Sequence, residues 1–266
     1  MVQRAPCGRR PPRAIPALLL ALILSWATAA TSAQQPLPDL AGRWAILQVT
    51  SQIGAIPLVG ERIRTSSTLA LLDIEQEGLL IRAQDATCST TIDNGTTLVK
   101  TEIPDAFIQS LPGLSWTTTL EPSDAGLDFV TPWITSVNGA RLEDPENDPL
   151  PTRADDPRVV DQDGDGKPGL TVHVSVMGGL ISGDVWVVQR DRSKLSGTIV
   201  SPDEIDGLVE WSSEQSVLGA SNPFLLGGTA ARPDPIAEHS YFRAHRVDDA
   251  TSCADLRVMA GTLFGK

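Results

Sequence analysis

Short runs of alternating apolar and polar residues, separated by turn residues, are the feature that most limits what this chain can fold into. The clearest run covers residues 170–177, where valines at every second position from Val172 alternate with polar residues. Successive side chains of a β-strand point to opposite faces, so this period of two predicts a strand with one buried face. Long helical patterns do not alternate with such runs, which disfavours a parallel α/β sheet.

The chain is expected to contain about ten such strands, joined by turns into an antiparallel β-barrel or β-sandwich. Residues 68–76 and 79–88 predict a hairpin around Glu77-Gly78, and residues 184–190 and 195–200 predict another around the polar segment 191–194. Further strands are expected at residues 43–50, 96–102 (after the turn Asp93-Asn94-Gly95), 117–121, 127–134, 208–217 and 241–247, and short helices at 104–110 and 254–260. The fold class is therefore all-β, with a short C-terminal helix.

Residues 1–33 have the three parts of a secretory signal peptide. Four arginines without an acidic residue precede the apolar run 17–24, and Thr31-Ser32-Ala33 forms a small-residue cleavage site before Gln34. The apolar run is too short to span a bilayer stably. We expect an exported protein, periplasmic, extracellular or on the cell surface, with residues 34–266 forming a single β domain and no stable membrane insertion after processing.

Acidic residues dominate the expected mature chain. The signal removes four of the 21 basic residues and none of the 33 acidic ones, which leaves a formal charge of −16. Such a chain repels phosphate backbones, so no nucleic-acid partner is expected, whereas metal ions are favoured. Two cysteines remain, Cys88 and Cys253, and an even pair in an oxidising compartment predicts a disulfide.

One acidic, proline-rich segment, residues 143–169, interrupts the strand pattern and is expected to be a loop. Within it, Asp161-Gln162-Asp163-Gly164-Asp165-Gly166 resembles the first half of a calcium loop of the EF-hand and dockerin type. The resemblance implies a structural calcium ion, with Asp161, Asp163 and Asp165 supplying carboxylate oxygens and Lys167 a backbone carbonyl. Val172 stands where those families have a bidentate glutamate, so a further ligand would have to come from Asp155 or Asp156.

A second resemblance rests on Gly42-Arg43-Trp44, which opens the first predicted strand. Lipocalins and related calycins begin their barrel with a Gly-x-Trp, so this chain resembles them at that point. The resemblance implies that Trp44 closes one end of a barrel. It also implies that an arginine of the last strand, Arg243 or Arg246, packs across the tryptophan ring.

No complete catalytic motif is evident. The chain lacks both the Gly-x-Ser-x-Gly elbow and the His-Glu-x-x-His zinc helix. His239 and His245 lie near Asp248, but no third histidine or cysteine follows at zinc-site spacing. Paired carboxylates for glycoside hydrolysis depend on spatial separation, which a sequence does not reveal.

We therefore expect an exported binding protein rather than an enzyme. Its partner would be a small apolar ligand or another envelope component. The alternative is an extracytoplasmic hydrolase acting on carbohydrate or ester substrates. A pocket with two close acids of raised pKa would favour the hydrolase.

Overall fold

The computed structural model describes residues 37–56, 60–123, 126–226 and 231–265. The predicted signal segment lies outside these residues. The strands are β1 (Gly42–Ile56), β2 (Gly60–Glu77), β3 (Leu80–Asp93), β4 (Val99–Glu102), β5 (Ser115–Thr119), β6 (Glu121–Ser123), β7 (Gly126–Val130), β8 (Ile134–Asn138), β9 (Leu170–Val176), β10 (Ile181–Ser201), β11 (Glu204–Ala220), β12 (Ala231–Pro233) and β13 (Tyr241–Arg246). The helices are α1 (Asp105–Ser110) and α2 (Cys253–Leu263), with single 3-10 turns η1 (Pro223–Leu225) and η2 (Ala237–His239).

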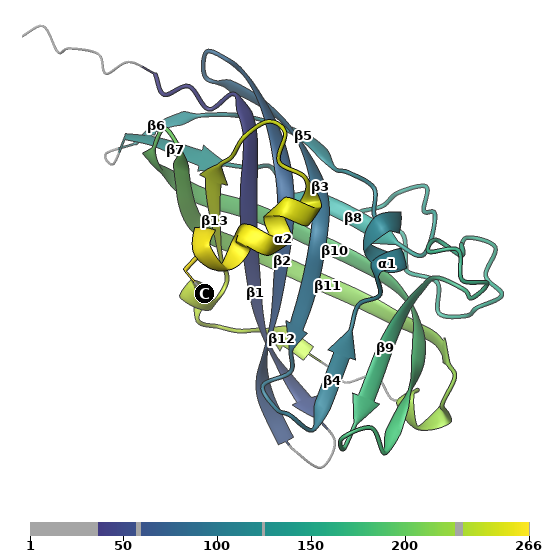
Figure 1. Cartoon of the computed structure of the whole chain (residues 1–266). Coiled ribbons are helices and arrows are strands. Elements are labelled where there is room, and N and C mark those ends of the chain that lie inside the picture. Colours follow the sequence, from purple (N-terminus) through teal and green to yellow (C-terminus); the bar gives the residue numbers. More distant parts are fainter. Residues whose placement is uncertain (1–36, 57–59, 124–125, 227–230, 266) are drawn as a thin grey trace, which may run out of the picture. The chain divides into compact units, whose positions relative to one another are not determined.

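These strands form one strongly curled antiparallel sheet, which confirms the all-β prediction (Figure 1). Its main path runs β4-β9-β10-β11-β13-β1-β2-β3-β5. Side-chain hydrogen bonds link its two ends: Asn94 after β3 donates to the Val99 carbonyl in β4, and Thr118 in β5 donates to the Val130 carbonyl in β7. The sheet therefore curls back on itself in a barrel-like form.

The first predicted hairpin is present. β2 and β3 pair up to Glu77 and Leu80, with Gly78 in the turn at a φ of 60°. L-residues with a Cβ rarely adopt this left-handed conformation, which explains the glycine. The predicted strands at 170–177, 208–217 and 241–247 correspond to β9, β11 and β13, and the predicted helices to α1 and α2.

The second predicted hairpin is wrong. The polar segment 191–194 is not a turn, because it lies inside β10, a single strand of 21 residues. Asp191 pairs with Ser213 of β11 on one edge and with Ser136 of β8 on the other. The turn comes later, between Ser201 and Glu204. A polar run can remain in a central strand here because Asp191, Arg192 and Ser193 line a cavity instead of a packed core, and Lys194 forms an ion pair with Glu210.

Two apolar clusters lie on opposite faces of β1 and β2. The inner cluster fills one end of the barrel and includes Trp44, Leu72, Phe129, Ile205 and Phe242. The outer cluster lies between the sheet and α2, whose Leu256 is completely buried against the outward-facing residues of β1 and β2 (Figure 1). Successive residues of β1 thus serve the two clusters alternately, as the period of two predicts.

A pair of cysteines at disulfide distance connects α2 to the sheet. Cys88 of β3 and Cys253 at the start of α2 are bonded, with a Cα–Cα distance of 5.0 Å, as predicted. Ser252 caps α2 by accepting a hydrogen bond from the Asp255 backbone, and Asp255 reciprocates. Within the described residues, no helix has both the length and the apolar character required to cross a membrane.

Candidate functional site

A cavity of about 980 Å³ lies inside the barrel next to the inner cluster, whose Ile46, Ala70 and Leu72 help to line it. Along β1 the inward-facing residues change from apolar Trp44 and Ile46 to polar Gln48, Thr50 and Gln52. Along β2 they change from Leu72 and Ala70 to polar Thr68, Ser66 and Arg64 in the same direction, because the two strands pair in register. The packed apolar end of the barrel and the cavity therefore lie next to each other along the same two strands.

The cavity reaches the surface at the end remote from Trp44. Leu98, Met177 and Phe224 contribute to its lining and are also exposed, Phe224 to 83%. Exposed apolar side chains at the rim of a cavity favour entry of an apolar molecule there.

One wall of the cavity is apolar. Val172 and Val174 of β9 and Val185 and Val187 of β10 line it, packed with Phe107 of α1. The inward-facing valines of β9 that the sequence predicts to share one face all line this cavity. They offer a surface with no hydrogen-bonding groups of its own beyond the paired backbone.

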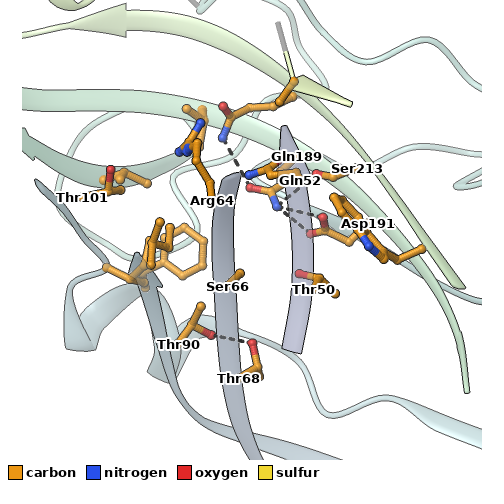
Figure 2. A pocket seen from close by; sticks show the side chains of 18 of the residues that line it. Thr50, Gln52, Arg64, Ser66, Thr68, Thr90, Thr101, Gln189, Asp191 and Ser213 are labelled. Atoms are coloured by element: carbon orange, nitrogen blue, oxygen red, sulfur yellow. Dashed lines mark hydrogen bonds between the residues drawn. The ribbon is translucent and has the colours of Figure 1, made fainter. Parts of the chain in front are cut away.

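The polar wall is built from β1, β2 and β3, and polar residues of β10 and β11, among them Gln189, Asp191 and Gln215, add to the polar lining. Figure 2 shows Thr50, Gln52, Ser66 and Arg64 projecting from β1 and β2 into the cavity. Deeper along β2, Thr68 forms a hydrogen bond of 3.2 Å with a threonine hydroxyl of β3. The two walls together suit a ligand that has both an apolar body and a polar group.

Arg64 of β2 places a cationic side chain in the polar wall. Its Nε donates to Asn94 Oδ1 at 3.0 Å. Among the described residues, no carboxylate forms an ion pair with it, and burial alone lowers the pKa of its guanidinium. Its terminal nitrogens have no protein acceptor within the described residues, and the side chain lines the cavity.

Asp191 is the most deeply placed acid of the cavity. Gln189 Nε2 donates to both carboxylate oxygens at 2.8 Å (Figure 2). Burial raises the pKa of Asp191, and the hydrogen bonds from Gln189 and Ser213 oppose that rise. Asp191 lines the cavity and is only partly exposed, and this burial disfavours the charged form of its carboxyl group.

Asp85 of β3 is a second acid with a raised pKa. Burial raises it, and the backbone N–H of Leu114, which donates to the carboxylate at 2.8 Å, lowers it. The charge of Asp191 is not among the causes of this shift, and Asp85 is not among those for Asp191. Burial is the largest cause of the raised pKa of each acid.

The predicted calcium loop brings its three aspartates together. Carboxylate oxygens of Asp161, Asp163 and Asp165 all lie within 4.8 Å of one another. Asp161 accepts hydrogen bonds from the backbone of Gly164, Asp165 and Gly166, which curls the loop around its carboxylate. Asp163 and Asp165 instead accept hydrogen bonds from Thr171 at the start of β9.

Asp163 is the member of this cluster least satisfied by the protein. Its Oδ2 accepts from the Thr171 backbone at 2.8 Å, whereas Oδ1 is buried and has no hydrogen-bond partner among the described residues. Burial, followed by the charges of Asp165 and Asp161, raises its pKa. A cation at this position would supply the missing partner and offset the repulsion.

The two aspartates considered as further calcium ligands have other partners. Asp155 forms an ion pair with Arg153 and Asp156 one with Arg158, and neither belongs to the metal-capable cluster. The Arg158 guanidinium holds the pKa of Asp156 at about 2. The Lys167 side chain lies over the Trp186 ring, with Nζ 5.2 Å from the centroid, and its backbone N–H donates to Asp165.

Arg246 occupies the position that the lipocalin resemblance implied for a last-strand arginine. Its guanidinium carbon lies 4.8 Å from the centroid of the Trp44 ring, whereas Arg243 lies over Tyr241. Arg246 also donates to the carbonyls of Asp39, Ala41 and Pro202 and to the Asp203 carboxylate. Trp44 is completely buried within the inner cluster.

Comparison with protein-family models, with curated proteins and with solved structures found no match for this chain. The lipocalin and calcium-loop resemblances therefore rest on the residues named above.

The histidines form no metal site within the described residues. His239 is hydrogen-bonded to Asp234 at 2.7 Å, and His245 packs against the Phe264 ring. The aspartate cluster of the acidic loop is the metal-capable group found in the described part of the chain.

Sequence reasoning missed the polar residues of the cavity. Arg64 and Asp85 lie in or beside the predicted first hairpin, and Asp191 lies in the segment predicted to be a turn. A usable signal was present: polar side chains at every second position of 48–52 and 64–68 face the same side as the apolar core residues that continue each strand. Such a change on an inward face indicates a lined cavity.

Proposed function

We propose that this chain is an exported binding protein that holds a small amphipathic ligand inside its barrel. The observation that carries the proposal is the 980 Å³ cavity with one apolar and one polar wall. Cavities of this size hold small organic ligands. The sequence expectation of an apolar ligand agrees with the β9 and β10 wall, and the β1 and β2 wall adds a polar group to that ligand.

Binding is favoured because the cavity is rigidly framed. Its floor rests on the inner cluster around Trp44 and Phe242, and its apolar wall on α1. A preformed cavity saves the ordering cost that a flexible site would incur on binding. The apolar wall supplies the hydrophobic contribution, about 25 cal/mol for each Å² removed from water.

A matched pair of substitutions on β9 tests ligand binding. Val174→Trp places an indole in the cavity, whereas Ser175→Trp places the same group on the opposite face of the strand. The compound carried by the purified protein is measured by native mass spectrometry and by solvent extraction. We expect a bound compound in the wild type and in Ser175→Trp and none in Val174→Trp. The proposal is contradicted if both variants retain the compound equally. It is also contradicted if none of the three proteins retains or takes up any compound.

Export is part of the same proposal. The basic, apolar and small-residue order before Gln34 supports it, and the Cys88–Cys253 pair is compatible with an oxidising compartment. Mass spectrometry of the protein from its native host should find an N-terminus within a few residues of Gln34. An intact Met1 on the exported protein contradicts cleavage.

We also propose that the loop at Asp161–Gly166 holds a structural calcium ion. The buried, unpartnered Oδ1 of Asp163 among three carboxylates favours it. The loop joins β8 to β9, and Thr171 connects its carboxylates directly to the first residues of β9. An ion there would fix where the apolar wall of the cavity begins.

The hydrolase alternative is favoured by one observation, that two acids lining the cavity, Asp85 and Asp191, have raised pKa values. Asp191→Asn distinguishes the two functions, because it would abolish turnover of a chromogenic ester or glycoside by a hydrolase. For a binding protein, neither the wild type nor the variant turns over such substrates.

A further inference from the structure

We propose that Arg64 binds the acidic headgroup of the ligand, so that the cavity selects an amphipathic anion such as a carboxylate with an apolar tail. This inference rests on the proposed binding function and adds the charge of the ligand to it. The observation that carries it is a cavity-lining guanidinium that, within the described residues, has no acidic partner.

The position of Arg64 is fixed by the fold and not by a counter-ion. Arg64 faces Gln52 across the β1–β2 pair, and its Nε donates to Asn94 Oδ1. Asn94 is itself buried, and its amide nitrogen donates to the Val99 carbonyl and the Thr101 hydroxyl. These two hydrogen bonds fix the orientation of the amide group, so its oxygen is the atom that faces Arg64.

This arrangement leaves the terminal nitrogens of Arg64 for a ligand. A guanidinium offers its donors in a planar fork that matches a carboxylate. Arg64 is partly buried, and a partly desolvated cation without a counter-ion gains from an anionic ligand that neutralises it. The apolar wall of β9 and β10 lines the same cavity, so one molecule can place its charged end on Arg64 and its tail against the valines.

Asp191 is less available to a cationic ligand than Arg64 is to an anionic one. Both of its oxygens already accept hydrogen bonds from Gln189, and Gln215 donates in turn to the Gln189 oxygen. Burial favours its protonated, neutral form. Two other arginines line the cavity: Arg192 lies over the Trp133 ring, 5.5 Å from its centroid, and Arg232 forms an ion pair with Glu61 at 2.7 Å. Arg64 has neither an ion pair nor a ring contact among the described residues, so we assign the headgroup to it.

Three probes with the same alkyl chain and different headgroups test the inference: dodecanoate, dodecanol and dodecylamine, each below its micellar concentration. Their dissociation constants are measured by isothermal titration calorimetry on the wild type, on Arg64→Gln and on Arg62→Gln. The last is the matched control, because Arg62 lies on the same strand, is exposed and does not line the cavity. Both variants change the net charge equally.

We expect the wild type and Arg62→Gln to bind dodecanoate about tenfold or more tightly than dodecanol, the range of a charge-assisted hydrogen bond. In Arg64→Gln the preference should disappear while dodecanol binds as before. Equal binding of dodecanoate and dodecanol by the wild type overturns the role of Arg64 and leaves the binding function standing. A preference for dodecylamine overturns it in favour of Asp191. Failure of all three probes to bind contradicts the binding function itself.

Discussion

The Arg246 guanidinium on the last strand lies over the Trp44 ring on the first strand, 4.8 Å from its centroid. β1 and β13 pair directly at this point, since Trp44 and Arg246 are register partners. The same arginine donates to carbonyls of the segment before β1 and of the turn between β10 and β11. A single side chain therefore connects three parts of the chain at the packed end of the barrel.

Replacing this arginine should destabilise the protein. Arg246→Lys keeps the charge but loses the planar fork that reaches several carbonyls, so we expect a loss of about 2 kcal/mol in the free energy of unfolding, measured by urea denaturation. Arg243→Lys, on the same strand, is the control and should change stability by about 0.5 kcal/mol or less. An equal loss in both variants would show that the contact with Trp44 has no special part.

Calcium should stabilise the protein through the acidic loop. An ion that binds the native state at a hundredfold excess over its dissociation constant adds about 2.7 kcal/mol. The melting temperature should rise with millimolar calcium and fall again with chelator. Asp163→Ala should remove this response and Asp155→Ala should retain it, because Asp155 is paired with Arg153 outside the cluster. If calcium leaves the melting temperature of each of the three proteins unchanged, the calcium proposal is wrong.

Stability should depend on pH through Asp191. Its pKa is raised in the folded state, so the folded protein binds this proton more tightly than the unfolded chain. The stabilisation is complete below the ordinary pKa of 3.8 and is lost as pH rises through the folded-state value. At neutral pH, Asp191→Asn should therefore unfold at higher urea than the wild type, and the difference should shrink below pH 3.8. Glu121→Gln, which removes an exposed carboxylate, should show no such trend; a constant difference at all pH values argues against this origin.

The cysteine pair should contribute strongly to stability. It closes a loop with a sequence separation of 165 residues. The chain-entropy model gives up to about 5 kcal/mol for so long a loop. The double variant Cys88→Ser and Cys253→Ser should lose much of this in urea denaturation, with α2 the first element to lose protection in hydrogen exchange. Non-reducing peptide mapping of the wild type should recover both cysteines in one linked peptide; two free thiols in protein isolated without reductant contradict the bond.

Local pattern was sufficient to predict those elements whose two faces differ in polarity. β9 has valines inward and polar residues outward, and the β2–β3 hairpin has Gly78 at the one position that requires a positive φ. Cys88 and Cys253 were predictable as a pair because only two cysteines follow the predicted signal segment.

The cavity could not be predicted in the same way, because its residues break the expected polarity. Segment 191–194 is polar enough to predict a turn, yet Asp191 lies inside the longest strand and faces a lined cavity. The roles of Arg64 and Asp191 depend on partners in other strands or beyond, Asn94 and Ser213, which sequence distance does not indicate. The aspartate cluster was local and could be predicted, whereas the ion pairs of Asp155 and Asp156 could not.

The pairing of the first strand with the last has a consequence for how the chain folds and fails. β1, β2 and β3 are adjacent in sequence and can pair as soon as they are made. The sheet is completed only when β13 pairs between β1 and β11. This pairing brings together residues far apart in sequence, such as Arg246 and Ala41, which are 205 residues apart. Until then Trp44–Val49 of β1 and Glu204–Leu208 of β11, the stretches that pair with β13, are open edges, and open edges recruit strands from other molecules. A chain truncated before Tyr241 should therefore aggregate through β1 and β11, even though most of its strands are intact.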